Sequence, residues 1–287
     1  MKTQDQQALR IYIRAREDVQ ALRKRMDNRL GMKADGTQQK VQDERSYSIE
    51  DAENFRYLSE SARQVEKDCE KMLKKILKRF AIYNEWLLLI KGVGPVSAGY
   101  LLSEFDIEKA TTVSKMWQYS GMNPGVRMGK KRVSKKSYKE SMGQIVEEKP
   151  NIKTGELDYI IQTDDLIRGD RRLEGYVSPY NKNLKTHLLG VMADGFIKQQ
   201  NSYALEYYYP YKLRKENSEA IIMNEGKERK DDGKKWNEVS KGHRDSAAKR
   251  YMVKMFLIDF YVAWRTIEGL PVREPYSEEY LGKKHSA

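Results

Sequence analysis

The segment that most constrains the fold is residues 88–105, where two apolar stretches flank a Gly-Val-Gly-Pro run at 92–95. Glycine tolerates positive φ and a close backbone approach, so two glycines around one hydrophobic residue allow a tight reversal between helices. Proline suits the first turn of the helix that follows. The segment predicts a helix-hairpin-helix whose exposed amides could hold a phosphate at Lys91, Gly92 and Gly94. Close crossing of two helices also explains such a turn.

The charge balance favours a polyanionic partner. The 287-residue chain has 54 Lys and Arg residues against 42 Asp and Glu residues, a formal net charge of +12, and nucleic acid is the commonest partner of such a surplus. We find neither a run of roughly 18 apolar residues typical of a spanning helix nor the apolar region of a signal peptide in residues 1–16. Cys69, the one cysteine, excludes an internal disulfide and a cysteine-based zinc cluster. We expect a cytoplasmic protein without a membrane segment, metal or other cofactor.

Two apolar stripes predict long helices at residues 2–30 and 48–77. Both stripes repeat at spacings of three and four, and the second is a narrow seam typical of coiled coils. Such helices could form an antiparallel coiled-coil hairpin, a dimer seam, or both. Cys69 lies on the second seam, where we expect a small buried hydrophobic residue. The stripes consist of Ala8, Ile11, Ala15, Val19, Leu22 and Met26, and of Phe55, Leu58, Ala62, Val65, Cys69, Met72 and Ile76.

The whole chain therefore predicts a mainly α fold in two parts, coiled-coil helices at 1–85 and a helical nucleic-acid-binding domain at 86–287 with a small β-containing insert at 131–178. Residues 203–211 include five tyrosines, which could stack on unpaired bases or pack between helices. In the second part we expect helices at about 112–120, from 181 onward and at about 243–267, and a β-hairpin formed by 143–146 and 157–162.

Basic residues gather in three places of the second part. Residues 125–139 hold seven basic residues and no acidic one. We expect a loop there, whose charges repel each other unless an anion lies between them. The other two places are the starts of the helices at 181 and 243, and at 181 the exposed amides also favour a phosphate. The candidate nucleic-acid contacts are Arg127, Lys130, Lys131, Arg132, Lys135, Lys136, Lys182, Asn183, Lys185, His187, Arg244, Lys249 and Arg250.

Acidic residues of the insert suggest a competing chemistry. Asp164, Asp165, Asp170 and Glu174 could hold Mg²⁺ for phosphodiester cleavage. Nuclease carboxylates usually converge from distant parts of a chain, and nothing in this sequence specifies that convergence. We therefore assign no metal ligand and no catalytic residue.

Four blocks resemble, in order, the C-terminal domain of bridge-RNA-guided insertion-sequence transposases. Those transposases begin with a ribonuclease-H-like domain and carry a nucleophilic serine in a Ser-Gly motif. Here the helical residues 1–85 are too short for that domain, and the corresponding residues 125–129 contain no serine. Ser134 and Ser137 lie nearby but outside the motif. The blocks are residues 89–104, 119–124, 177–185 and 247–275.

A coiled coil followed by this domain, without a nuclease, is similar to the Nop-type RNA-binding domain of box C/D ribonucleoproteins. It is most similar to the nuclease-free Tas proteins of tandem-interspaced-guide-RNA (TIGR-Tas) systems. The resemblance implies a non-catalytic protein that binds a structured guide RNA, often as a homodimer through the coiled coil, while base pairing selects target DNA. Two alternatives remain open: a DNA transposase or recombinase with a displaced catalytic serine, and a DNA-binding protein that needs no RNA.

Overall fold

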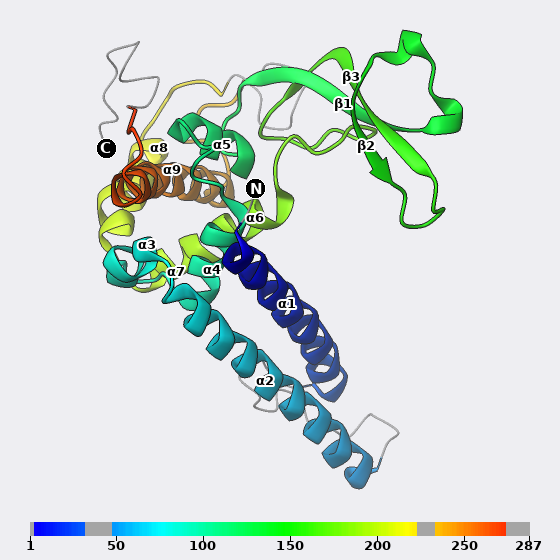
Figure 1. Cartoon of the computed structure of the whole chain (residues 1–287). Coiled ribbons are helices and arrows are strands. Elements are labelled where there is room, and N and C mark those ends of the chain that lie inside the picture. Colours follow the sequence, from blue (N-terminus) through cyan, green and yellow to red (C-terminus); the bar gives the residue numbers. More distant parts are fainter. Residues whose placement is uncertain (1–2, 32–47, 223–232, 274–287) are drawn as a thin grey trace. The chain divides into compact units, whose positions relative to one another are not determined.

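A computed structural model describes residues 3–31, 48–222 and 233–273 and divides the chain into two compact units, residues 1–106 and 107–287 (Figure 1). The fold is mainly helical and includes a three-stranded antiparallel sheet. The mainly α class with a small β portion is thereby confirmed. Within the described ranges, no helix combines the length and the apolar character needed to cross a bilayer.

The first unit is built on two long helices, α1 (Gln4–Leu30) and α2 (Ile49–Leu77). Thr3 begins α1 with a capping box, and Gly31 ends it in the left-handed region at φ 67°. Ion pairs join the helices, and in three of them the partner in α2, or just after it, comes earlier in the chain as the α1 residue comes later. These pairs, which establish an antiparallel arrangement, are Asp5 with Arg79, Arg16 with Glu70, and Arg23 with Glu66.

A buried polar cluster lies between α1 and α2. Arg23 Nη1 is 2.7 Å from Asp27 Oδ2, and Arg23 Nε pairs with Glu66. Asp27 also accepts hydrogen bonds from Ser59 and from Arg63, the latter at 3.0 Å. The side chains of Asp27, Arg23 and Glu66 are only 4%, 8% and 9% exposed. The hydrogen bond that Arg23 donates to Glu66 is the main cause that raises the pKa of the Arg23 guanidinium.

The residues of the predicted stripes are only partly covered within the unit. Ile11, Leu22, Leu58 and Val65 are exposed, and the interface between the helices also includes the charged cluster, which the periodicity of hydrophobic residues cannot detect. Cys69 is buried as expected, and burial raises the pKa of its thiol. The buried residues on the two helices are Gln6, Leu9, Ile13, Arg23, Met26, Asp27, Leu30, Ser59, Ala62, Glu66, Cys69, Leu73, Ile76 and Leu77.

The predicted tight turn falls in this same unit. Helix α3 (Ala81–Glu85) and the 3₁₀ turn η1 (Leu87–Leu89) precede it, and α4 (Pro95–Glu104) follows. Gly92 adopts φ 98°, a conformation that favours glycine. Gly94 begins α4 at φ −80° with Pro95 in the first turn.

Helix α4 packs on the long helices, so the first unit extends to residue 106 rather than to the boundary expected at 85. The side-chain amide of Gln6 donates to the carbonyl oxygens of Leu102 and Phe105 at 3.0 and 3.2 Å. A Cβ atom added at Gly99 would lie 3.1 Å from Ile13 Cδ1, so the absence of a side chain there allows α4 to approach α1 closely.

The second unit is organised around α9 (Lys241–Ile267), which buries one face along most of its length. Tyr261 donates a hydrogen bond to the carbonyl oxygen of Thr111 at 2.8 Å, and Arg265 donates to that of Ile107 at 2.8 Å. These bonds tie α9 to the start of the unit. The expected helices are confirmed as α5 (Val113–Ser120), α6 (Lys182–His187) and α9. The unit's other main helices are the π-helical η4 (Leu188–Met192), α7 (Ala193–Lys198), the π-helical η5 (Ala204–Tyr208) and α8 (Tyr209–Glu216).

The sheet has the strand order β1-β3-β2, formed by β1 (Val126–Ser134), β2 (Gln144–Pro150) and β3 (Leu157–Arg168). The expected hairpin is confirmed as β2 and β3. The loop expected at residues 125–139 was wrong, because the basic run pairs its backbone with β3 over most of its length. Short 3₁₀ turns η2 (Lys135–Ser137) and η3 (Glu140–Met142) connect β1 to β2.

We predict that Asp27→Ala destabilises the protein strongly. The substitution leaves Arg23 and Arg63 without a carboxylate that both contact, and removing one partner from a buried ionic cluster costs about 3–5 kcal/mol. Urea unfolding followed by circular dichroism measures the loss. Asp5→Ala is the matched control, because Asp5 belongs to an exposed pair with Arg79 and such pairs contribute about 1 kcal/mol or less. Equal losses for the two variants would contradict the importance of the cluster.

Candidate nucleic-acid interface

Several cations of the basic strand β1 are paired within the protein. Lys131 Nζ lies 3.1 Å from Asp165 Oδ2 and 4.5 Å from the centre of the Tyr176 ring. Hydrogen bonds to Tyr176 and Asp165 raise the pKa of Lys131. Arg132 Nε lies 2.6 Å from Asp158 Oδ2. Lys136 pairs with Glu156, whereas Lys130 and Lys135 are exposed.

Arg127 supports the backbone instead of facing solvent. Its guanidinium donates to the carbonyl oxygen of Pro179, and burial lowers its pKa. The amide of Val177 donates to the carbonyl oxygen of Lys130 at 2.7 Å. The segment that leads into α6 therefore runs beside β1, which brings two of the predicted basic groups together.

Helix α6 begins at an Asn181 cap, whose side chain accepts from the amide of Leu184 at 3.1 Å. Lys182 and Asn183 are exposed on its first turn, whereas His187 is buried in the core. Gly121 ends α5 at φ 71°, where an added Cβ would lie 2.7 Å from the Tyr180 ring, so the end of α5 packs against the residues before the cap.

Lys185 is the half-buried cation of this helix. Its Nζ donates to the carbonyl oxygen of Asp170 at 2.6 Å and lies 4.3 Å from the centre of the Tyr180 ring. Burial is the main cause that lowers its pKa; the Asp170 charge opposes the shift, and the charges of Arg250 and Arg171 add to it. Arg171, just after β3, and Arg250 on α9 therefore both lie within electrostatic range of Lys185.

The three candidates on α9 have different surroundings. Arg244 is buried and donates to backbone carbonyl oxygens that precede the helix, including that of Asn237 at 3.1 Å. Lys249 Nζ lies 2.8 Å from Asp194 and 3.0 Å from Asp245. Arg250 forms no ion pair with a carboxylate in the described part of the chain. Arg250 is thus the α9 candidate most available to an external anion.

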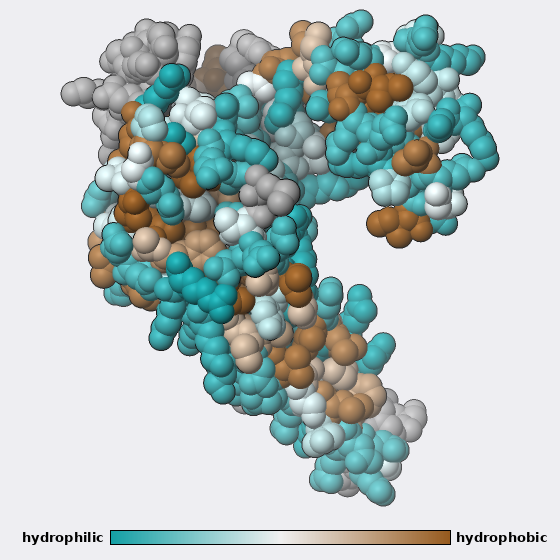
Figure 2. All heavy atoms as spheres, viewed as in Figure 1, coloured by the Kyte–Doolittle hydropathy of each residue, from teal (hydrophilic) through white to brown (hydrophobic). Residues whose placement is uncertain are grey.

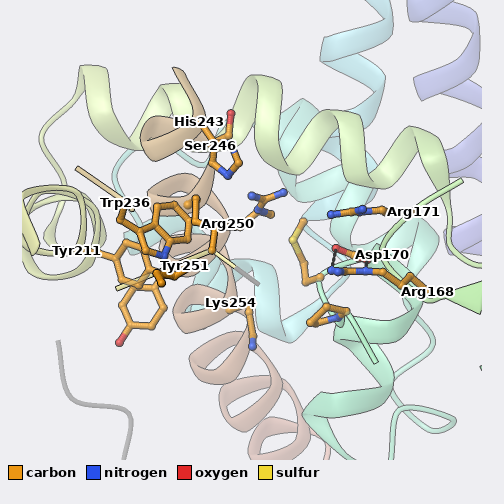
Figure 3. A pocket seen from close by; sticks show the side chains of 15 residues that line it. Arg168, Asp170, Arg171, Tyr211, Trp236, His243, Ser246, Arg250, Tyr251 and Lys254 are labelled. Carbon is orange, nitrogen blue, oxygen red and sulfur yellow. Dashed lines mark hydrogen bonds and ion pairs between the residues drawn. The ribbon is translucent and has the colours of Figure 1, made fainter. Parts of the chain in front are cut away.

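An open pocket of about 750 Å³ lies beside Arg250 (Figure 3). In the figure, Tyr211, Trp236 and Tyr251 gather on one side, while Arg168, Asp170 and Arg171 lie across the pocket from them. Apart from His243, the pocket lining has four basic side chains and one acidic one. Sequence reasoning missed Arg168, Arg171, Lys254 and Trp236, because their spacing along the chain follows no motif.

Some tyrosines of residues 203–211 pack between helices, and another lines the pocket. Tyr203 stacks on Phe196 at 5.6 Å and donates to Asp259 at 2.7 Å. Tyr208 donates to Asp245. Burial raises the pKa of both phenols far above the usual value. These two rings pack between helices, whereas Tyr211 lines the pocket.

The predicted nucleic-acid contacts belong to different units of the chain. Lys91, Gly92 and Gly94 belong to the first unit, and the candidates from Arg127 to Arg250 belong to the second. Asp165 and Asp170 pair with Lys131 and Arg168. Among residues 3–31, 48–222 and 233–273, no three His, Cys, Asp or Glu side chains form a group suited to a metal ion. Ser134 donates to Ser137 at 2.8 Å on the exposed sheet.

Comparisons of the chain with protein-family models, with curated proteins and with solved structures found no match.

We predict that Lys182→Ala weakens nucleic-acid binding and lowers its salt dependence by about one unit of log-log slope, since one phosphate contact is lost. Lys198→Ala is the matched control, because it removes the same charge at the far end of the helical segment formed by α6, η4 and α7. At 1.5 Å per residue, the two positions are about 24 Å apart. Fluorescence anisotropy of labelled RNA at several salt concentrations measures both. A similar loss for both variants would argue against a contact specific to Lys182.

Proposed function

We propose that this protein is a non-catalytic RNA-binding protein that holds a structured guide RNA and supports RNA-guided recognition of target DNA. In such a system base pairing selects the sequence, and the protein contacts backbone and shape. The proposal combines the resemblance of the four sequence blocks with the chemistry of the second unit.

One observation carries the proposal: Arg171 and Arg250 line one pocket together with Arg168 and Lys254, and both lie near enough to Lys185, on a third segment, for their charges to lower its pKa. The neighbouring carboxylate, Asp170, already forms two hydrogen bonds with Arg168, at 3.0 and 3.1 Å. Partly desolvated like charges repel, and a bound phosphate relieves both the repulsion and the cost of burial. Lys130 and Lys182 are exposed, and the proposal assigns them further phosphate contacts.

The turn at 92–94 supports a second contact in the first unit. A Cβ atom at Gly94 would meet nothing within 4 Å, and its φ of −80° suits any residue, so packing within the protein does not require glycine there. A close approach of a phosphate to the amides at the start of α4 would use that open space. We extend the proposal to Lys91, Gly92 and Gly94 as a backbone contact in a helix-hairpin-helix.

The direct test is to purify the protein at low salt and sequence the nucleic acid that accompanies it. The proposal expects one defined, structured RNA, and it expects DNA binding only when the DNA matches a segment of that RNA. Selective binding to one duplex after complete ribonuclease treatment would support an RNA-independent DNA-binding protein instead. Strand cleavage, or a covalent protein–DNA adduct in the presence of Mg²⁺, would replace the proposal with a transposase or recombinase.

We also propose that α1 and α2 form a coiled-coil hairpin through which two copies of the chain associate. The exposed fractions of Ile11, Leu22, Leu58 and Val65 are 67%, 50%, 50% and 46%, and the spacings along both helices are those of a coiled-coil seam. Figure 2 shows hydrophobic side chains gathered along the face of the hairpin in view. A second copy presents the same seam, so a two-fold arrangement would cover both.

We predict that Leu58→Glu combined with Val65→Glu converts a dimer into a monomer, because charges on a covered seam lose their hydration. Light scattering coupled to size-exclusion chromatography measures the mass. Glu60→Gln with Lys67→Gln is the control, since both side chains are exposed on the same helix outside the predicted seam. A wild-type protein that is monomeric at all concentrations would overturn the dimer without affecting the RNA-binding proposal.

A further inference from the structure

The pocket beside α9 combines two chemically different walls. Its volume of about 750 Å³ is within the usual range of small-molecule sites, roughly 300–1,000 Å³. Tyr211, Trp236 and Tyr251 supply aromatic rings on one side, and arginines from the end of β3 lie on the other, with Arg250 and Lys254 contributed by α9 (Figure 3). All these residues belong to the second unit, so the described lining of the pocket comes from one compact part of the chain.

The basic wall has more positive charge than its carboxylate can offset. Asp170 pairs with Arg168 through Nε at 3.0 Å. Lys254 Nζ lies 4.3 Å from the centre of the Trp117 ring, and burial lowers its pKa. Neither Arg250 nor Lys254 forms an ion pair with a carboxylate of the described chain. Arginine donates several hydrogen bonds in a planar arrangement that matches phosphate oxygens.

The aromatic wall is held in place by contacts among its own residues. The rings of Tyr211 and Tyr251 stack with centres 4.5 Å apart and planes 23° apart. Trp236 meets His243 edge to face at 5.4 Å, and Lys215 Nζ lies 4.3 Å from the centre of the indole ring. Rings fixed in this way offer a surface for a flat base at little cost in side-chain entropy.

We infer that this pocket binds one unpaired nucleotide of the RNA, with the base against Trp236 and the tyrosine pair and the phosphate between Arg250 and Arg171. A phosphate alone would need no aromatic wall, and an apolar ligand would leave the surplus positive charge of the other wall unneutralised. The inference rests on the proposed RNA-binding function and adds to it a place where a single base leaves the RNA fold. A free nucleotide has the same chemistry, so the test separates the two sources.

The test uses the full-length protein freed of accompanying RNA by ribonuclease and high salt. The probes are a fluorescent single-stranded RNA pentamer, unlabelled adenosine and uridine monophosphates, and inorganic phosphate. We expect Arg250→Gln to weaken pentamer binding at least about tenfold, because a hydrogen bond to a charged group is lost. Trp236→Leu should weaken it about tenfold through lost stacking. Lys241→Ala, an exposed change on the first turn of α9, should have little effect.

Circular dichroism and thermal unfolding of each variant show whether it folds. Because Trp236 contacts Lys215 and His243, Trp236→Phe serves as the milder second variant, and it should retain most of the binding. Pentamer binding that Arg250→Gln, Trp236→Leu and Lys241→Ala all leave unchanged would overturn the inference.

Competition identifies the source of the nucleotide. If the monophosphates displace the pentamer only at much higher concentration, the occupant is part of an RNA chain, as inferred. If a monophosphate binds as tightly as the pentamer, the pocket serves a free nucleotide and the RNA assignment fails. If inorganic phosphate competes as well as the monophosphates do, the base is not recognised and the inference fails.

Failure of the pocket inference can be distinguished from failure of the proposed function. In one outcome the protein binds its structured RNA with steep salt dependence while the pocket variants bind the pentamer as tightly as the wild type. That result keeps the proposed function and rejects the pocket. A protein that binds the pentamer through Arg250 but neither co-purifies with nor binds structured RNA keeps the pocket without the function.

Discussion

The RNA-binding account depends on electrostatic repulsion among partly buried cations. Lys185 lies within range of Arg171 and Arg250, and burial together with those two charges lowers its pKa. The nearby Asp170 carboxylate is already engaged by Arg168. A protein whose cations only solvated its surface would separate them, because exposed like charges repel and gain nothing from proximity. The fold instead holds them together, at an electrostatic cost that a bound anion would offset.

Helix α9 makes this arrangement possible. Its apolar face is anchored in the core through residues such as Phe256 and Trp264, while Arg250 and Lys254 extend from it into the pocket. The end of β3 and the start of α6 meet at the hydrogen bond between Lys185 and the Asp170 carbonyl oxygen. Segments far apart in sequence are thereby fixed around one cavity, and the cations need little rearrangement to receive a ligand.

The sequence predicted the long helices well, because hydrophobic spacing, the Gly31 stop and the Ser48 cap all act locally. It failed where the decisive interactions are non-local. The cluster of Arg23, Asp27 and Glu66 lies in an interface that periodicity predicts to be apolar. Strand β1 was taken for a loop because its stability comes from backbone pairing with β3 in a largely exposed sheet, so its sequence shows mainly charge.

Runs of basic residues predicted part of the candidate site, and the hydrogen bonds seen in the structure corrected that prediction. Charge runs indicated Lys182, Lys185 and Arg250, and the structure places the last two near one another. The charge runs could not reveal that Arg127 and Arg244 donate hydrogen bonds to backbone carbonyl oxygens. Arg168 and Arg171, across the pocket from the aromatic wall, were not predicted, since they lie far from α9 in the sequence and follow no motif.

The most direct test of the central claim is the dependence of RNA affinity on salt concentration for the wild-type protein. Several simultaneous phosphate contacts, each releasing counterions, predict a linear fall of log affinity against log salt with a slope of at least about 3. A slope near zero, or no RNA binding even at low salt, would contradict the claim that the gathered cations serve to bind a folded polyanion.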